Sequence, residues 1–119
     1  MQLPGVRFEA TEFTPRTIPG MISKPRFEGR LVRGVRLIVT DARAYQPLET
    51  GVHVLEAMDG EAKAAGRKLV SKPDWLAKLM GTRRLHELYV KGAGAGALIA
   101  AWQRDVTEFR AMRAKYLLY

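Results

Sequence analysis

The chain has 119 residues, a length typical of one domain, and 47% of them are hydrophobic, which is enough for a modest buried core. Twenty Lys and Arg residues against twelve Asp and Glu give a formal net charge of +8, so the chain attracts anions. The absence of cysteine excludes disulfides, thiolate metal sites and cysteine nucleophiles. No apolar run approaches the roughly 18 residues that span a bilayer, and the sequence MQLPGVRFEA lacks the apolar segment of a signal peptide.

The first third of the chain predicts two strands separated by a long loop. Residues 5–13 alternate between apolar and polar side chains, which is typical of a half-buried strand. Residues 31–41 return to extended structure, and the apolar run within them favours a central place in a sheet. Gly34 indicates a bulge or a close backbone approach, and Asp41 ends the strand in an Asx-type turn.

The loop between these strands is rich in proline and in positive charge. Pro15, Pro19 and Pro25 exclude regular structure and lower the entropic cost of ordering the segment. Its side chains include four cations and two aromatic rings, namely Arg16, Lys24, Arg26, Arg30, Phe13 and Phe27. This combination suits a sugar acid, a phosphate or nucleic-acid bases, so we expect the loop to bind a ligand or another domain.

The rest of the chain predicts four helices. The first begins at Pro47 and runs to about Gly66. Ser71 is the predicted N-cap of the second, with Pro73 in the first turn and Asp74 at the third position, close to a capping box.

Thr82 is the predicted cap of the third helix, and Gly92 ends it. Residues 92–96, GAGAG, form a hinge before the last and longest helix. One apolar stripe runs along that helix: Leu98, Ile99, Trp102, Val106, Phe109, Met112 and Tyr116. Strands followed by helices predict an α+β fold, with a small antiparallel sheet of two or three strands packed against about four helices.

No motif in the chain specifies a catalytic or metal site. GAGAG resembles a phosphate loop, but a helix precedes it and it lacks the P-loop Lys, so a helix–helix turn is favoured. His53 is predicted beside an apolar helix face and His86 on an exposed one, without metal-ligand spacing. Asp41 and Glu49 flank one turn, where capping and solvent exposure explain them. The other carboxylates considered are expected in surface ion pairs: Glu56, Glu61, Glu87, Asp105 and Glu108.

Several ordered segments resemble one known family. They are PGVRF, FTPRTIPGM, GVRLIVTD, YQPLETG, LMGTRRL and FRAMRAKYLLY. Together they resemble the C-terminal domain of the exo-β-N-acetylmuramidase (NamZ-like) family of bacterial peptidoglycan glycosidases, across nearly the whole chain. Residues 59–72 depart from the family pattern, since a polar, Ala-rich segment replaces one that usually contains aromatic residues.

The resemblance implies that residues 1–119 form a single ancillary domain. In this family the catalytic carboxylates lie on a Rossmann-like N-terminal domain, which is expected to be absent from this chain, and none of their positions has a match here. We therefore expect no catalytic residue, metal or cofactor in the chain, and no activity from it alone. The predicted partners are a catalytic domain, in cis or in trans, and peptidoglycan fragments, while the parent enzyme is expected in the cell envelope or outside the cell.

The resemblance also suggests roles for the loop. Its cations would face the lactyl carboxylate of N-acetylmuramic acid, with these candidate substrate-binding residues: Thr14, Arg16, Thr17 and Lys24. An equally weighted alternative is that the loop only docks on the catalytic domain. The candidate interface residues are Met21, Ile22, Phe27, Tyr116, Leu117, Leu118 and Tyr119. Two other functions stay open, a small basic nucleic-acid-binding module, which is less favoured, and a stand-alone muropeptide-binding domain.

Overall fold

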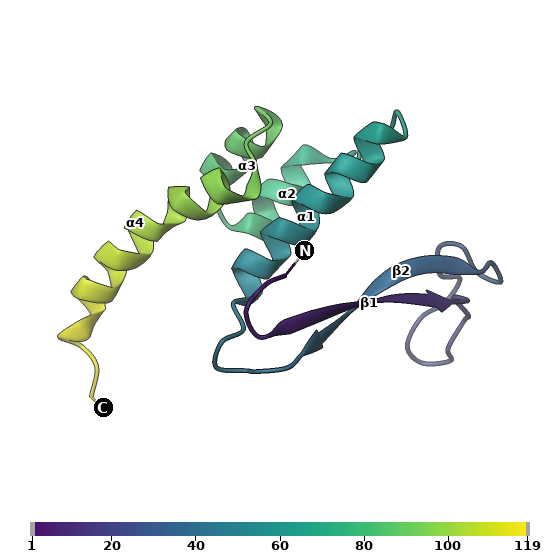
Figure 1. Ribbon diagram of the computed structural model, residues 1–119, viewed down its shortest axis with the longest axis horizontal. Coiled ribbons are helices and arrows are strands. Elements are labelled where there is room, and N and C mark those ends of the chain that lie inside the picture. The colour runs from purple at the N-terminus through teal and green to yellow at the C-terminus, as the bar shows by residue number, and fades with distance from the viewer. Residues whose placement is uncertain (1, 119) are drawn as a thin grey trace. The chain divides into compact units, whose positions relative to one another are not determined.

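A computed structural model describes residues 2–118, and Figure 1 shows two strands followed by four helices. The predicted α+β fold, with a two-stranded antiparallel sheet and the last helix the longest, is confirmed. The chain divides into two compact units, Met1–Gln46 and Pro47–Tyr119. None of the described helices is long and apolar enough to cross a lipid bilayer.

The first unit is a hairpin of β1 (Val6–Phe13) and β2 (Val32–Val39). The antiparallel register is continuous from the pair Val6 and Val39 to the pair Phe13 and Val32. The bulge considered at Gly34 is therefore wrong, because this residue lies directly opposite Thr11. The predicted central place of the second strand is also wrong within residues 2–118, where the sheet has two strands only.

The alternation of side chains explains this register. One face of the hairpin pairs Phe8 with Leu37 and Ala10 with Val35, so apolar side chains meet across the strands. A shift by one residue in either direction would place Arg36 opposite one of these apolar side chains. At the end of the same face, Arg33 Nε donates to Glu12 Oε1 at 2.9 Å.

A tight turn at Gly5 joins the start of β1 to the end of β2. The Gly5 carbonyl accepts hydrogen bonds from the backbone N–H groups of Thr40 at 2.9 Å and Asp41 at 3.3 Å. Asp41 Oδ1 accepts from the Arg43 N–H at 2.8 Å, which confirms the predicted Asx-type turn. Gly5 has a φ of +69°, and a Cβ there would lie 2.4 Å from the Asp41 carbonyl oxygen, so the turn requires glycine.

The second unit contains α1 (Pro47–Ala64), α2 (Pro73–Met80), α3 (Arg83–Val90) and α4 (Ala95–Ala114). Its buried core lies where α1, α3 and the first turn of α4 meet, and consists of Val52, Leu85, Ala95 and Leu98. Half-buried side chains surround this core: Met80, Leu88, Tyr89, Ala101 and Trp102.

Helix boundaries follow backbone chemistry, with one correction. Pro73 is the first residue of α2, so Lys72 is the N-cap and no side chain caps the helix; the predicted capping role of Ser71 is wrong. Thr82 caps α3 as predicted, because its Oγ1 accepts from the Arg84 N–H at 3.2 Å. Gly92, with a φ of +82°, ends α3 as predicted.

Only the first half of α4 packs against the other helices of this unit. Leu98 is 2% exposed, whereas Phe109 and Met112 are each 54% exposed. The predicted apolar stripe therefore exists, but its second half has no packing partner within the described part of the helical unit. In Figure 1 this half of α4 runs clear of the other helices.

Candidate functional site

The loop between β1 and β2, residues 14–31, is a series of hydrogen-bonded turns. The first turn spans Ile18 to Met21 and closes with a 3.0 Å bond from the Met21 N–H to the Ile18 carbonyl. Pro19 and Gly20, the latter with a φ of +78°, occupy the central positions that favour these residue types in a type II turn. Met21 lies at this tip and is 82% exposed.

A second set of bonds ties the two arms of the loop together. The Thr17 hydroxyl donates to the Glu28 carboxylate and accepts from the Lys24 backbone N–H at 3.1 Å. The Thr17 backbone N–H donates to the same carboxylate oxygen at 2.9 Å, and the Gly29 N–H donates to the Pro15 carbonyl at 2.9 Å. Thr17 thus fixes the shape of the loop, since its hydroxyl is already engaged on both sides.

Two residues of this loop have an unusual backbone conformation. Lys24 has a φ of +50° and Phe27 a φ of +62°. Among residues 2–118 these are the two non-glycine residues with positive φ. A side chain other than glycine is strained there by roughly 1–3 kcal/mol, and such strain is concentrated at functional sites.

The loop and the adjoining strand ends line a hollow of about 700 Å³ that is open to solvent. Six apolar and three cationic residues line it: Phe13, Pro15, Ile22, Pro25, Phe27, Val32, Arg16, Arg26 and Arg33. The register brings these strand ends together, since Phe13 pairs with Val32 and Glu12 with Arg33. We refer to this site as the loop hollow.

The three arginines of the loop hollow differ in their partners. Arg33 is paired with Glu12 at 2.9 Å. Within the described part of the chain, no carboxylate forms an ion pair with Arg16 or Arg26. The Arg26 guanidinium lies 5.4 Å from the centroid of the Phe27 ring, a cation–π distance. The hollow therefore presents two cations without a counter-charge beside apolar walls.

The structure places the predicted site residues at different points of the loop. Arg16 lines the loop hollow, whereas Thr14, Thr17 and Lys24 do not. Of the predicted interface residues, Ile22 and Phe27 line the hollow and Met21 forms the exposed tip. Tyr116, Leu117 and Leu118 are exposed beyond the end of α4, and Tyr119 lies outside the described residues.

Val32 and Arg33 belong to the hollow but were not predicted as site residues. The signal that identifies them is the strand register, which follows from pairing the apolar side chains of residues 5–13 and 31–41. Sequence alone does not fix that register to one residue, because the loop between the strands is long.

The GAGAG segment of the helical unit is a turn between α3 and α4, as predicted, and its Ala95 N–H is already hydrogen-bonded. Glu56 Oε1 accepts from the Ala95 N–H at 2.9 Å, at the start of α4. A carboxylate at a helix N-terminus also complements the helix dipole. Glu56 was expected in a surface ion pair, and its Oε2 does lie 3.8 Å from His53 Nδ1. Its Oε1 also links α1 to α4.

A polar cluster one turn further along α1 joins it to α3. Tyr89 Oη donates to Asp59 Oδ1 at 2.9 Å, and Lys63 Nζ lies 2.6 Å from Asp59 Oδ2. The hydrogen bond from Lys63 lowers the pKa of Asp59. Burial, followed by the bond to Asp59, raises the pKa of Tyr89 to about 12. Lys63, Asp59 and Tyr89 are mutually satisfied, so we regard this cluster as structural.

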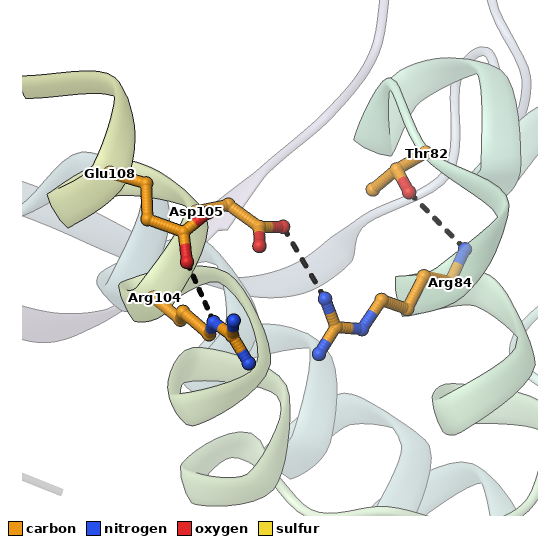
Figure 2. A network of polar contacts seen from close by, with 5 residues as sticks. All are labelled: Thr82, Arg84, Arg104, Asp105 and Glu108. Atoms are coloured by element: carbon orange, nitrogen blue, oxygen red, sulfur yellow. Dashed lines mark hydrogen bonds and ion pairs between the residues drawn. The ribbon is translucent and has the colours of Figure 1, made fainter. Parts of the chain in front are cut away.

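A surface network joins α3 and α4 near the Thr82 cap. Figure 2 shows Arg84 and Arg104 each facing a carboxylate, at 3.4 Å to Asp105 and 2.7 Å to Glu108. The predicted surface pairing of these two carboxylates is confirmed. Exposed pairs of this kind contribute little to stability, so the network does not indicate a site.

The remaining polar candidates do not assemble a reactive centre. Among residues 2–118, no group of three or more His, Asp or Glu side chains could hold a metal ion. His86 is half-buried, contrary to its predicted exposure, and its buried Nε2 has no hydrogen-bond partner in the described structure. Asp41 is engaged in its turn, and Glu49 accepts from Gln103 Nε2 at 3.3 Å.

Comparison with known proteins gives one family and one relative. Residues 1–119 match the family described as "Exo-beta-N-acetylmuramidase NamZ, C-terminal". The chain is 27% identical over 125 residues to the "Peptidoglycan beta-N-acetylmuramidase NamZ" of Bacillus subtilis (strain 168). This alignment covers 100% of the chain and 27% of that relative's length. No solved structure matches the chain.

Proposed function

The chain belongs to the family of NamZ C-terminal domains, and on that premise we propose that it is the accessory domain of a bacterial peptidoglycan exo-β-N-acetylmuramidase. The match to this family over residues 1–119 is the observation that supports the proposal most directly. In this role residues 1–119 act as one ancillary domain beside a separate catalytic domain, in the same polypeptide or in another. The domain borders the cleft that holds a terminal N-acetylmuramic acid, and by itself it cleaves nothing.

The loop is the part of the domain that we assign to the cleft. Arg16 lines the loop hollow and has no carboxylate partner among the described residues, which leaves its guanidinium available to an anionic substrate. Lys24 supplies a second cation from the same loop, and Thr14 a hydroxyl. Thr17 acts indirectly, because its hydroxyl holds Glu28 and the Lys24 backbone.

Exposed apolar side chains form the proposed contact with the catalytic domain. Met21 is 82% exposed and Leu118 is 95% exposed. Met21 and Ile22 form one apolar surface, on the loop. Tyr116, Leu117 and Leu118 form the other, after the end of α4. Apolar side chains gathered in this way are typical of surfaces that another domain covers.

A chimera tests the proposal. The region of the Bacillus subtilis relative that matches this chain is deleted, and residues 1–119 are fused in its place. We expect no release of N-acetylmuramic acid from a chromogenic muramide by the chain alone, loss of turnover on deletion, and recovery of turnover in the chimera. Release of the sugar by the chain alone, or a chimera no more active than a stably folded deletion protein, would contradict the proposal.

Two substitutions in the chimera test the loop. Arg16→Ala and Lys24→Ala should each lower turnover, because each removes a cation from the side of the cleft. Arg43→Ala is the control, since it removes a cation from the other end of the hairpin unit, next to the Asp41 turn. Equal turnover in all three variants would show that these loop cations do not act on the substrate.

A further inference from the structure

The loop hollow has the chemistry of a sugar-acid site. We propose that it binds a six-membered sugar ring bearing a carboxylate, with Arg26 as the carboxylate ligand and Phe27 as the stacking surface. Arg16 is the second cation of this site. The inference rests on the proposed function only for the identity of the sugar, N-acetylmuramic acid; Arg26 and Phe27 are assigned from the geometry of the hollow.

The charge of the hollow indicates an anion. Arg33 is neutralised by Glu12 at 2.9 Å, while Arg16 and Arg26 have no such partner within the part of the chain that the structure describes. Two like charges beside one apolar surface repel each other, and an anion between them removes that repulsion. A planar guanidinium binds a carboxylate through two parallel hydrogen bonds.

The walls of the hollow indicate that the anion carries an apolar face. Six of the nine lining residues are Phe, Pro, Ile or Val. A bare phosphate or acetate would leave these walls in water, whereas the C–H face of a sugar ring can cover an aromatic ring. The hollow, at about 700 Å³, falls within the range of about 300–1,000 Å³ that is typical of small-molecule sites.

The backbone at Phe27 supplies an independent argument. Its φ of +62° places a bulky residue in a region that glycine adopts without strain. Glycine would fit the turn better, yet an aromatic ring is held there, 52% exposed and facing the hollow. Because an exposed ring contributes little to a core, the strain is best explained by a ligand that covers the ring.

The side chains of Arg26 and Phe27 also contact each other. The Arg26 guanidinium lies over one face of the Phe27 ring, 5.4 Å from its centroid, so the cation and the ring are adjacent and the other face of the ring is left for a ligand. A ligand whose carboxylate is joined to a ring through a short ether can contact both groups at once, which is the arrangement in a muramic acid.

The first experiment compares ligands on the whole 119-residue chain. Heteronuclear NMR follows the backbone amides of residues 13–33 during titration with N-acetylmuramic acid, N-acetylglucosamine, lactate and a nucleoside monophosphate. We expect N-acetylmuramic acid to bind at least about tenfold more tightly than each of the others, the difference expected for an unpaired charged group or a lost stacking surface. Equal affinity for N-acetylglucosamine, tighter binding of the nucleotide, or no binding of N-acetylmuramic acid at millimolar concentration would overturn the inference.

Matched variants then test the two assigned residues. Arg26→Gln should weaken binding about tenfold, whereas Arg30→Gln should leave it unchanged, because Arg30 belongs to the same loop but does not line the hollow. Phe27→Gly should weaken binding while leaving stability equal or higher, since glycine relieves the positive φ, and Phe27→Tyr should restore binding. Equal losses at positions 26 and 30, or wild-type binding by Phe27→Gly, would contradict the assignment.

These measurements separate the inference from the proposed function. The NMR titration needs no catalytic domain, and the chimera assay needs no measurable affinity in the isolated chain. A chain that binds N-acetylmuramic acid but fails to restore turnover in the chimera would disprove the accessory role and keep the binding site. Recovery of turnover without binding at the hollow would support the accessory role and disprove the binding site.

Discussion

Among the glycines, Gly5 is the one where an added Cβ would meet the closest backbone atoms. A Cβ at this position would lie 2.4 Å from the Asp41 carbonyl oxygen and 2.5 Å from the Tyr45 backbone nitrogen, and the φ is +69°. Both obstacles are backbone atoms, which cannot move without opening the Asp41 turn. We expect Gly5→Ala to lower the free energy of unfolding by about 3 kcal/mol or more, measured by denaturant unfolding.

Gly20 provides the matched control for this prediction. Its φ is +78°, but no atom lies within 4 Å of a Cβ built there. Gly20→Ala should therefore lower the free energy of unfolding by only about 1 kcal/mol, the cost of a positive φ for alanine. If the two substitutions cost the same, the close approach at Gly5 is not the cause of the loss.

Tyr89 should make stability sensitive to alkaline pH. Its pKa is raised from 10.0 to about 12 in the folded chain, by burial and then by the bond to Asp59. The folded state therefore holds this proton more tightly than the unfolded state. The resulting stabilisation is fully present below pH 10.0 and is lost as the pH rises through about 12.

The test compares wild type with Tyr89→Phe. At neutral pH the variant should be less stable by about 1 kcal/mol, because Asp59 loses a hydrogen-bond donor. Between pH 10.0 and about 12, the free energy of unfolding of the variant should fall less steeply than that of wild type. Parallel curves over this range would show that the proton of Tyr89 does not stabilise the folded chain.

At the scale of elements, the start of α4 depends on a side chain from α1. Glu56 Oε1 accepts from the Ala95 N–H at 2.9 Å, and a Cβ at Gly94 would lie 2.7 Å from that oxygen. Glu56→Ala should destabilise the chain by about 1 kcal/mol and speed amide exchange in the first turn of α4. Glu61→Ala, on the exposed end of the same helix, is the control and should leave both quantities nearly unchanged.

The sequence predicts most elements because their signals are local. Alternation over residues 5–13 and a proline at position 47 correspond closely to β1 and to the start of α1. Thr82 and Gly92 mark the ends of α3 for equally local reasons. Ser71 fails as a cap because two signals compete there, and Pro73, at the first helical position, determines where α2 begins.

The loop shows why the candidate site is only partly predictable. Proline and glycine identify a turn at residues 18–21, but the bond between Thr17 and Glu28 joins residues that no short motif relates. Sequence composition predicts a basic, aromatic loop, and the family resemblance suggests Arg16 as one of its substrate-binding residues. The positive φ of Phe27 and the placing of Arg33 beside the hollow depend on the folded backbone and the strand register.

At the scale of the whole molecule, the net charge of +8 is divided between the two units. Residues 1–46 contain eight Lys and Arg against four Asp and Glu, and residues 47–119 contain twelve against eight. One cation on α3, Arg84, and one on α4, Arg104, are already paired with carboxylates. The excess charge is therefore spread along the chain, and nucleic-acid binding usually requires a continuous basic surface.

We therefore expect weak and purely electrostatic binding of nucleic acid. The affinity for a fluorescent duplex should fall below detection near 0.15 M salt, roughly the physiological ionic strength. Binding of N-acetylmuramic acid, which involves one negative charge, should change much less over the same salt series. Tight duplex binding that survives this salt concentration would instead support the basic-module alternative.

Every residue that lines the loop hollow lies between Phe13 and Arg33. Phe13 and Val32 face each other across the hairpin, so the two ends of this segment are adjacent in space. A synthetic macrocycle closed one pair further out, at Glu12 and Arg33, would thus contain the complete hollow. Grafted onto the end of an unrelated hairpin, the segment would therefore carry every residue that lines the hollow.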